Sequence, residues 1–212
     1  MILTGLTAFF VFLFIYDLVK SDKPFKHYDS FDIGYLIVIA CLALVCARTP
    51  FKFWQLENSL SMHASTFSQR EGVTVSCTSV FDSIFDPFDI SRAGTAYVET
   101  GEIIFHHGWC KNFMDYIDDP SEPSDRALFS MHVFTHEVMH IRGELNERKT
   151  DCQAIQRNHL LGRQLGVDDD IARRNAVDYY KRLYKKHPYF SKECAPGKAL
   201  DENLMDSIWL EL

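Results

Sequence analysis

Several features are missing from this chain of 212 residues, and their absence limits what the protein can be. No block of lysine or arginine stands out and the formal net charge is −7, so nucleic acid is not an expected partner. No internal repeat and no low-complexity segment is present. Because 47% of the residues are hydrophobic and 14% are aromatic, the chain is too apolar to be disordered and is long enough for one real core. At this length we do not expect a large multidomain protein.

Charged residues are absent from two stretches near the N-terminus, residues 1–16 and 33–47. Each stretch is slightly shorter than the ~20 residues that a helix needs to cross a bilayer, and the flanking residues supply the remainder. We therefore predict two transmembrane helices at about residues 1–19 and 32–48. Together they would form a membrane anchor over residues 1–53, with the lipid bilayer as its partner.

Other interpretations of the two apolar stretches stay open. A signal peptide usually has a lysine or arginine before its apolar region, and here there is none. A single span and a buried helical hairpin are two further alternatives. The sequence Val38-Ile39-Ala40-Cys41 looks like a lipoprotein cleavage box, but it lies in the middle of the second stretch.

The orientation of the anchor depends on the basic residues beside the two predicted spans. The loop has three of these residues and the other side has two: Lys20, Lys23 and Lys26 against Arg48 and Lys52. This difference weakly favours a cytoplasmic loop. We therefore expect a multi-pass membrane protein whose domain over residues 54–212 is extracytoplasmic.

The cysteines include no C-x-x-C pair, so they do not indicate a structural zinc site. Four lie outside the predicted anchor: Cys77, Cys110, Cys152 and Cys194. An even number of well-separated cysteines suits two disulfides in an oxidising compartment, in agreement with the expected orientation. Three pairings are possible, and four reduced thiols are the alternative.

Residues 54–212 are predicted to form one acidic α+β domain, mostly helical with a short sheet. Apolar and turn patterns predict its first elements in this order: a helix over 57–69, a strand over 73–77, a loop over 81–90, a hairpin of strands 95–98 and 103–105, and a helix over 109–117. Gly101 can take the left-handed position of the hairpin turn.

The remaining elements are predicted to be helices. Apolar residues recur at helical spacing from Asp125 until Gly143. A further single helix is predicted over residues 147–164. Residues 168–170 would cap another helix over 171–187, which Pro188 would end.

The helix that begins at Asp125 contains the sequence His136-Glu137-Val138-Met139-His140. Its two histidines are four residues apart, so their imidazoles project from one face and can share a single Zn²⁺ at about 2.0 to 2.1 Å. Glu137 can reach a water beside the metal without binding the metal itself. It would accept a proton as the water attacks a carbonyl and return it to the leaving amine.

This pattern resembles the H-E-x-x-H motif of the zincin metallopeptidases, over about 30 residues. Val133, three residues before the first histidine, fits the longer zincin pattern, whereas Arg142 stands where the family usually has an apolar residue. The resemblance implies a zincin-like domain that holds one Zn²⁺ per chain and hydrolyses peptide or protein substrates. The alternative is a core helix with an ordinary buried histidine pair.

The third zinc ligand is the weakest part of the resemblance. Gly143 matches the glycine of the metzincin motif, but the third metzincin histidine would fall at Asn146. The stretch from Glu147 to Ala154 instead resembles the gluzincin pattern E-x-x-x-D-x-x-A. That resemblance implies Glu147 as a zinc ligand, with Asp151 orienting a ligand histidine and serving as the alternative third ligand.

Gluzincins usually place many more residues between the second histidine and the glutamate than this chain does. The assignment of Glu147 therefore depends on the turn at Gly143, and an ordinary solvated helix face is the alternative. The pattern also resembles small, membrane-anchored bacterial H-E-x-x-H proteins with an acidic residue followed by cysteine, here Asp151-Cys152. This second resemblance names no substrate.

Other polar residues are assigned by weaker arguments. His132 is on the same helical face as His136, where it could hydrogen-bond near the site or pack against the next element, and packing is the favoured interpretation. By resemblance to zincins, residues 95–107 would line the substrate cleft through an edge strand. The sequence does not identify the donor that would stabilise the oxyanion, and four residues are candidates: Tyr179, Tyr180, His159 and His132.

These observations predict a membrane-anchored zinc metallopeptidase with His136, His140 and Glu147 as ligands and Glu137 as general base. Two other functions are alternatives: a zinc-binding protein that has lost its activity, and a membrane-bound interaction module with an accidental motif. An amidase is a variant of the first prediction, because the same chemistry serves other carbonyl substrates.

Overall fold

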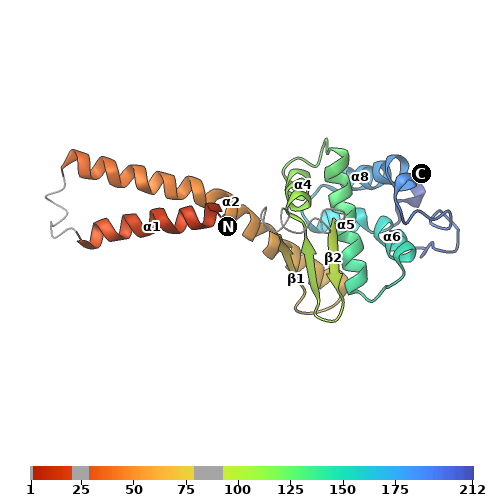
Figure 1. The fold of residues 1–212 in the computed structure, drawn as a ribbon. Helices are drawn as coiled ribbons and strands as arrows, with labels where there is room; N and C mark the ends of the chain where they lie inside the picture. The colour runs from red at the N-terminus through yellow and green to blue at the C-terminus, as the bar shows by residue number, and fades with distance from the viewer. Residues whose placement is uncertain (1, 21–28, 79–92) are drawn as a thin grey trace. The chain divides into compact units, whose positions relative to one another are not determined.

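The computed structural model describes residues 2–20, 29–78 and 93–212 (Figure 1). The chain divides into two compact units, Met1–Gln55 and Leu56–Leu212. The first unit contains helix α1 (Ile2–Lys20) and the beginning of helix α2 (Ser30–Ser68). Both helices are long and apolar enough to cross a membrane, and few or none of the side chains in their apolar windows are buried. This exposure distinguishes them from the core helices of a soluble domain, although a signal sequence has the same length and composition.

Helix α2 is longer than the sequence predicts. The prediction was a span at about residues 32–48 and a separate helix over 57–69, but α2 is continuous over 39 residues with Pro50 inside it. Proline removes one backbone hydrogen bond, yet its fixed φ is itself close to the helical value, so it need not end the helix. The C-terminal part of α2 thereby belongs to the second unit.

That part of α2 covers one edge of a small sheet. The side chains of Glu57, Ser61 and Ser65 are spaced four residues apart, so they lie on one face of the helix. They accept hydrogen bonds from the backbone N–H groups of Cys77, Val75 and Val73, at 2.8, 2.8 and 3.2 Å. Alternate N–H groups of the first strand are therefore satisfied by helix side chains instead of another strand.

The sheet has three strands in the order β1-β3-β2, namely β1 (Thr74–Cys77), β2 (Gly94–Tyr97) and β3 (Glu102–Phe105). Strand β1 runs parallel to β3, and β2 is antiparallel to β3. The hairpin of β2 and β3 confirms the sequence prediction, and Gly101 has the expected positive φ of 79°. The predicted loop over 81–90 lies outside the described residues.

The outer edge of β2 can be identified from its hydrogen bonds. The carbonyl groups of Ala93 and Tyr97 accept from His106 and Gly101, so both face β3. Because backbone groups alternate along a strand, the polar groups of Gly94 and Ala96 face away from the sheet. Within the described sheet, the edge of β1 is thus covered by α2, while the outer edge of β2 is not paired with another strand.

Besides the end of α2, the described helices of the second unit are α4 (His107–Asp118), α5 (Asp125–Ile141), α6 (Glu147–Ile155), α7 (Asn158–Gln164) and α8 (Asp169–Arg182). Two 3₁₀ segments follow, Tyr184–Lys186 and Ile208–Glu211. Helix α5 is the central element: most of its side chains are buried, and it contacts the sheet and the helices on either side. The Ser124 side chain caps its start by accepting from the backbone of Ala127.

Two of the predicted helix boundaries are wrong. Residues 147–164 form two helices, because Gln156 directs its side-chain amide to the carbonyl groups of Cys152 and Leu200 and the chain turns after it. The helix expected over 171–187 ends at Arg182. There Leu183 leaves the helical path and Tyr184 becomes fully buried, with its hydroxyl near Ser191.

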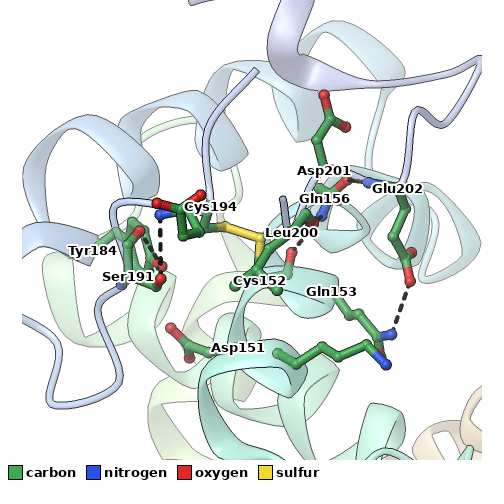
Figure 2. The surroundings of a disulfide bond; sticks show 12 residues. Asp151, Cys152, Gln153, Gln156, Tyr184, Ser191, Cys194, Leu200, Asp201 and Glu202 are labelled. Atoms are coloured by element: carbon green, nitrogen blue, oxygen red, sulfur yellow. Dashed lines mark hydrogen bonds between the residues drawn. A yellow bond between two sulfur atoms is a disulfide. The ribbon is translucent and has the colours of Figure 1, made fainter. Parts of the chain in front are cut away.

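Two disulfides are formed, as the cysteine count predicts, and the structure selects their pairing: Cys77–Cys110 and Cys152–Cys194. The first joins the end of β1 to α4. The second joins α6 to the C-terminal segment, beside Asp151 and the contacts between Gln156 and Leu200 (Figure 2). The chain that follows α8 is therefore fastened to the helix that carries Glu147 and Asp151.

Candidate metal centre

A cavity of about 740 Å³ opens beside the middle of α5. Its walls come from β2 and its N-terminal flank, from α4 and α5, from the start of α6, and from residues 187–189. His136, Glu137, His140 and Glu147 all line it. The structure therefore brings four of the five predicted site residues to one surface.

Helix α5 positions the two histidines of the motif. Both imidazoles leave the same face of the helix, and their Nε2 atoms are 3.0 Å apart. His136 is buried and His140 is only slightly more exposed. The burial of α5 on both sides fixes the backbone from which they project, so their separation is set by the helix itself.

The turn after α5 brings Glu147 back to the histidines. Gly143 has φ of 111°, a conformation that L side chains rarely adopt, and the chain reverses there. Asn146 then caps α6 by accepting from the backbone of Lys149, and Glu147 is the first residue of that helix. The Glu147 Oε2 atom lies 3.1 Å from His136 Nε2 and 3.4 Å from His140 Nε2.

The three converging atoms fit a tetrahedral metal ion. Ligand atoms that lie about 2.0 to 2.1 Å from such an ion are separated by about 3.3 to 3.4 Å. The observed separations are 3.0, 3.1 and 3.4 Å, so a small shift of the side chains would accommodate an ion. His136, His140 and Glu147 are therefore a group that could hold a metal ion.

The other ring nitrogen of each histidine is directed away from this point. His140 Nδ1 lies 2.7 Å from the backbone oxygen of Glu144, and His136 Nδ1 lies 3.3 Å from Asp151 Oδ1. An Nδ1–H that points at a carbonyl or carboxylate leaves the Nε2 lone pair available for a metal. Asp151 thus lies behind His136, the histidine that the sequence resemblance implies as a ligand.

A second group of side chains could also hold a metal ion: His132, His136 and Asp151. His132 Nε2 is 2.8 Å from Asp151 Oδ1, and Asn158 Nδ2 is 3.2 Å from His132 Nδ1. If the Asn158 amide donates to Nδ1, then Nε2 carries the proton and donates to Asp151. The contact of His132 with Asp151 is therefore a hydrogen bond behind the first group. His132 also stacks on Tyr179, so the packing expected of it is only part of its role.

The electrostatics of the group follow from burial and close opposite charges. Burial alone would lower the pKa of His136, but its hydrogen bonds to Asp151 and Glu147 raise that pKa to about 9. Burial would raise the pKa of Asp151, yet the neighbouring histidines His132, His136 and His187 hold it well below its usual value. The hydrogen bond to His136 lowers the pKa of Glu147. A metal ion that binds here must displace a proton from the metal-free site.

Glu137 is in a different environment from Glu147. It is buried, and burial raises its pKa although His136 and His140 oppose this shift. The backbone N–H of Ala96 on β2 donates a hydrogen bond to its carboxylate. Gly94 lies against it so closely that a Cβ atom there would be 3.1 Å from Glu137 Cγ. The acid is therefore held between the motif helix and the open edge of the sheet.

Sequence reasoning missed two aromatic residues of the cavity, His187 and Tyr189. His187 Nδ1 is 3.3 Å from Asp151 Oδ1, and the Tyr189 ring is stacked on His136 with ring centroids 5.8 Å apart. Both come from the segment that follows α8 and is fastened by Cys194. The only signal for them in the sequence was the cysteine downstream, whose partner was unknown.

The four residues weighed earlier as oxyanion donors lie in different places. Tyr179 is fully buried, Tyr180 bonds to the backbone of Cys194, and His159 bonds to the backbone of Asp206. Of the four, His132 alone is among the residues that line the cavity. His187 and Tyr189 reach the cavity wall instead.

No family model, no curated protein and no solved structure matches this chain. The residues and their arrangement are therefore the whole basis for a function. Among the described residues, they combine three side chains that could hold a metal ion, a buried carboxylic acid and a strand edge without a paired strand, all along one cavity.

Proposed function

We propose that this protein is a membrane-anchored zinc metallopeptidase. The observation that carries the proposal is the convergence of His136, His140 and Glu147 to within 3.0 to 3.4 Å of one another, beside Glu137 and on the wall of the cavity. Two imidazole nitrogens and one carboxylate oxygen, with one side open, are the ligand set of a catalytic zinc site.

His136, His140 and Glu147 would hold one Zn²⁺ per chain. When bound, zinc supplies Lewis-acid chemistry: it lowers the pKa of a water and polarises a carbonyl group. The choice of this group over His132, His136 and Asp151 is supported by its position, since Glu147 is half-exposed at the cavity whereas Asp151 is fully buried. Asp151 is then the residue that orients His136.

Glu137 would act as the general base. A general base accepts a proton from the attacking water and returns it to the leaving amine, which requires a pKa above that of a free carboxylic acid. The burial of Glu137 raises its pKa in this direction. Its place beside His136, but outside the three converging atoms, leaves it free for proton transfer.

The edge of β2 supports a peptide as the substrate. The backbone N–H of Ala96 donates to Glu137, whereas the Ala96 carbonyl and the backbone groups of Gly94 face away from the sheet, and residues 93–96 line the cavity. An extended peptide can add to such an edge by backbone hydrogen bonds, while its side chains enter the cavity. The described residues that line the cavity include no lysine or arginine, and they include the apolar side chains of Trp109, Phe129 and Val133.

The membrane anchor over residues 1–53 and the extracytoplasmic location of the peptidase domain over residues 54–212 are part of the same proposal. Helices α1 and α2 have the length and composition of membrane spans. The two disulfides support an oxidising compartment for the second unit. Both disulfides lie outside the spans, whereas the free Cys41 and Cys46 lie within α2.

Hydrolysis of a peptide library by the full-length protein in detergent tests the proposal. The wild type should cleave peptides and lose this activity when a chelator removes the metal. Glu137→Gln should keep the zinc and reduce cleavage by about 10³-fold or more. Glu144→Gln is the matched control: its side chain bonds Lys149 and the Asn146 backbone, so cleavage should be unchanged.

Each contrary result has a distinct meaning. If the wild type binds zinc but cleaves no peptide, the protein is a zinc-binding protein without this activity. Cleavage that persists undiminished in Glu137→Gln would contradict the role of that residue. A folded wild type without zinc would contradict the whole proposal.

A further inference from the structure

Asp151 is the centre of a buried histidine cluster that the zinc ligands do not explain. Its Oδ1 atom lies 2.8 Å from His132 Nε2, 3.3 Å from His136 Nδ1 and 3.3 Å from His187 Nδ1. A carboxylate that only orients one ligand needs one such neighbour. Here one buried oxygen faces three imidazoles, from helix α5 and from the segment after α8.

His132 is the best-fixed member of this cluster. Its side chain is 1% exposed, its ring is stacked on Tyr179 with centroids 4.1 Å apart, and Asn158 of helix α7 bonds its Nδ1 atom. These contacts form a continuous series from Asn158 through His132 to Asp151, and from Asp151 to His136. Asp151 Oδ2 has no hydrogen-bond partner, and the contacts of Oδ1 with His136 and His187 are longer than its hydrogen bond with His132, so the hydrogen bond from His132 fixes the rotation of the carboxylate.

We propose that His132 is a positioning residue of the metal centre, which holds the Asp151 carboxylate against His136 and thereby sets how His136 presents its Nε2 atom. This inference rests on the proposed zinc site. A histidine ligand whose Nδ1–H is held by a carboxylate binds metal more tightly than one whose ring can turn. His132 acts one contact further from the metal, through Asp151 alone.

The position of His132 distinguishes this role from ordinary packing. Without its N–H, the Asp151 carboxylate could rotate toward His187, and His136 would lose its support. The structure supplies a comparison in His159, which is also fully buried on a neighbouring helix. Its Nε2 atom donates instead to the backbone oxygen of Asp206, in the C-terminal segment.

The test compares the zinc affinity of full-length variants in detergent, by competition with a chromophoric chelator. His132→Phe keeps an aromatic ring against Tyr179 but removes the hydrogen bonds, and it should weaken zinc binding by about 10 to 100-fold. His132→Gln retains a donor near the position of Nε2 and should recover most of the affinity. His159→Phe, the same change at the other buried histidine, should bind zinc as the wild type does even if its melting temperature falls.

A second variant tests the same role in case His132→Phe does not fold. Asn158→Leu removes the support of His132 from behind and should weaken zinc binding in the same direction by a smaller factor. The visible spectrum of the cobalt-loaded protein should change in His132→Phe and not in His159→Phe, because only the first alters the ligand geometry.

Several results would overturn the inference. They are wild-type zinc affinity in both His132→Phe and Asn158→Leu, an equal loss of affinity in His159→Phe, or no recovery in a folded His132→Gln. If the wild type itself binds no zinc, then the proposed function fails first and this inference fails with it. The two failures are therefore distinguishable.

Discussion

A single residue, Gly94, determines how closely strand β2 approaches Glu137. Gly94 and Glu137 belong to different elements, and a Cβ atom at residue 94 would lie 3.1 Å from both Glu137 Cγ and the Phe105 ring. That separation is shorter than an ordinary contact between carbon atoms. The absence of a side chain at residue 94 is thus what allows β2 to lie over the acid.

Gly94→Ala should therefore displace Glu137 or the strand. We expect peptide cleavage to fall by about tenfold or more and stability to fall by about 1 kcal/mol, while zinc content is unchanged. Kinetic assays beside elemental analysis would measure this. Gly108→Ala is the control, because a Cβ atom there meets nothing within 4 Å. Unaltered cleavage in Gly94→Ala would show that the close contact does not position the acid.

His159 makes a residue-scale contribution to the pH dependence of stability. Burial lowers its pKa to about 4 from 6.5, and Arg173 and Arg163 add to this shift. The folded protein then binds fewer protons than the unfolded chain, so stability is lost as the pH falls from about 6.5 to about 4. A difference of one unit between the folded and unfolded pKa corresponds to about 1.4 kcal/mol of unfolding free energy.

Between pH 7 and pH 4, the wild-type domain over residues 54–212 should lose about 2 to 3 kcal/mol more unfolding free energy than His159→Gln. Urea denaturation followed by tryptophan fluorescence at several pH values measures the difference. Parallel curves for the two proteins would mean that His159 remains able to take up a proton in the folded state.

Individual helices and strands were predicted well from local patterns, but the elements that each one pairs with or packs against were not. The motif helix α5 and the hairpin of β2 and β3 follow from apolar spacing and from Gly101, both of which are encoded within a few residues. The parallel pairing of β1 with β3, and the cover that Glu57 and Ser61 give to β1, join segments far apart in the chain. No local pattern contains that information.

Some residues of the candidate site could likewise be predicted from local spacing, and others could not. His136, Glu137 and His140 come from one helix, so their spacing alone predicts that they share a face. The structure brings Glu147 to them through the turn at Gly143. His187 was missed because it reaches Asp151 only after the chain has passed through two more helices.

The break between α6 and α7 also shows why sequence reasoning stopped short. Residues 147–164 have helical spacing throughout, but the side chain of Gln156 bonds to Leu200 in the C-terminal segment and its carbonyl oxygen accepts from Glu202. A distant segment therefore competes with the local helix. The break in turn places Asn158 at the start of α7, next to His132.

The two disulfides offer a test at the scale of elements. They close loops of similar size, with sequence separations of 33 and 42, so removal of either should cost about 2 to 4 kcal/mol. Cys152 directly follows Asp151 (Figure 2). Cys77 and Cys110 instead join β1 and α4. We therefore expect serine at Cys152 and Cys194 to weaken zinc binding, and serine at Cys77 and Cys110 to leave it nearly unchanged. Denaturation and chelator competition measure the two effects, and an equal loss of zinc affinity in both would contradict the expectation.

At the scale of the whole molecule, the two units differ in where their apolar side chains lie. The first unit exposes large apolar side chains along α1 and α2, both of which are long and apolar enough to cross a membrane. The second unit has a buried core around α5 and two disulfides. Their combination in one chain supports a membrane-anchored domain in an oxidising compartment.

Removal of residues 1–53 should therefore transfer the protein from the membrane fraction to the soluble fraction. A reporter enzyme that is active only outside the cytoplasm, fused after Leu212, should be active in the full-length protein. Fractionation and reporter assays measure both. A full-length protein that alkaline carbonate washes from the membrane would contradict the anchor, and a reporter found in the cytoplasm would contradict the orientation and the compartment expected for the disulfides.

The metal content of the purified full-length protein tests the central proposal most directly. Elemental analysis should find about one zinc per chain in the wild type, and His136→Ala and Glu147→Ala should each lose most of it while remaining folded. That result would agree with the site formed by His136, His140 and Glu147. A folded wild type that contains no zinc, and that takes up none when zinc is supplied, would contradict it.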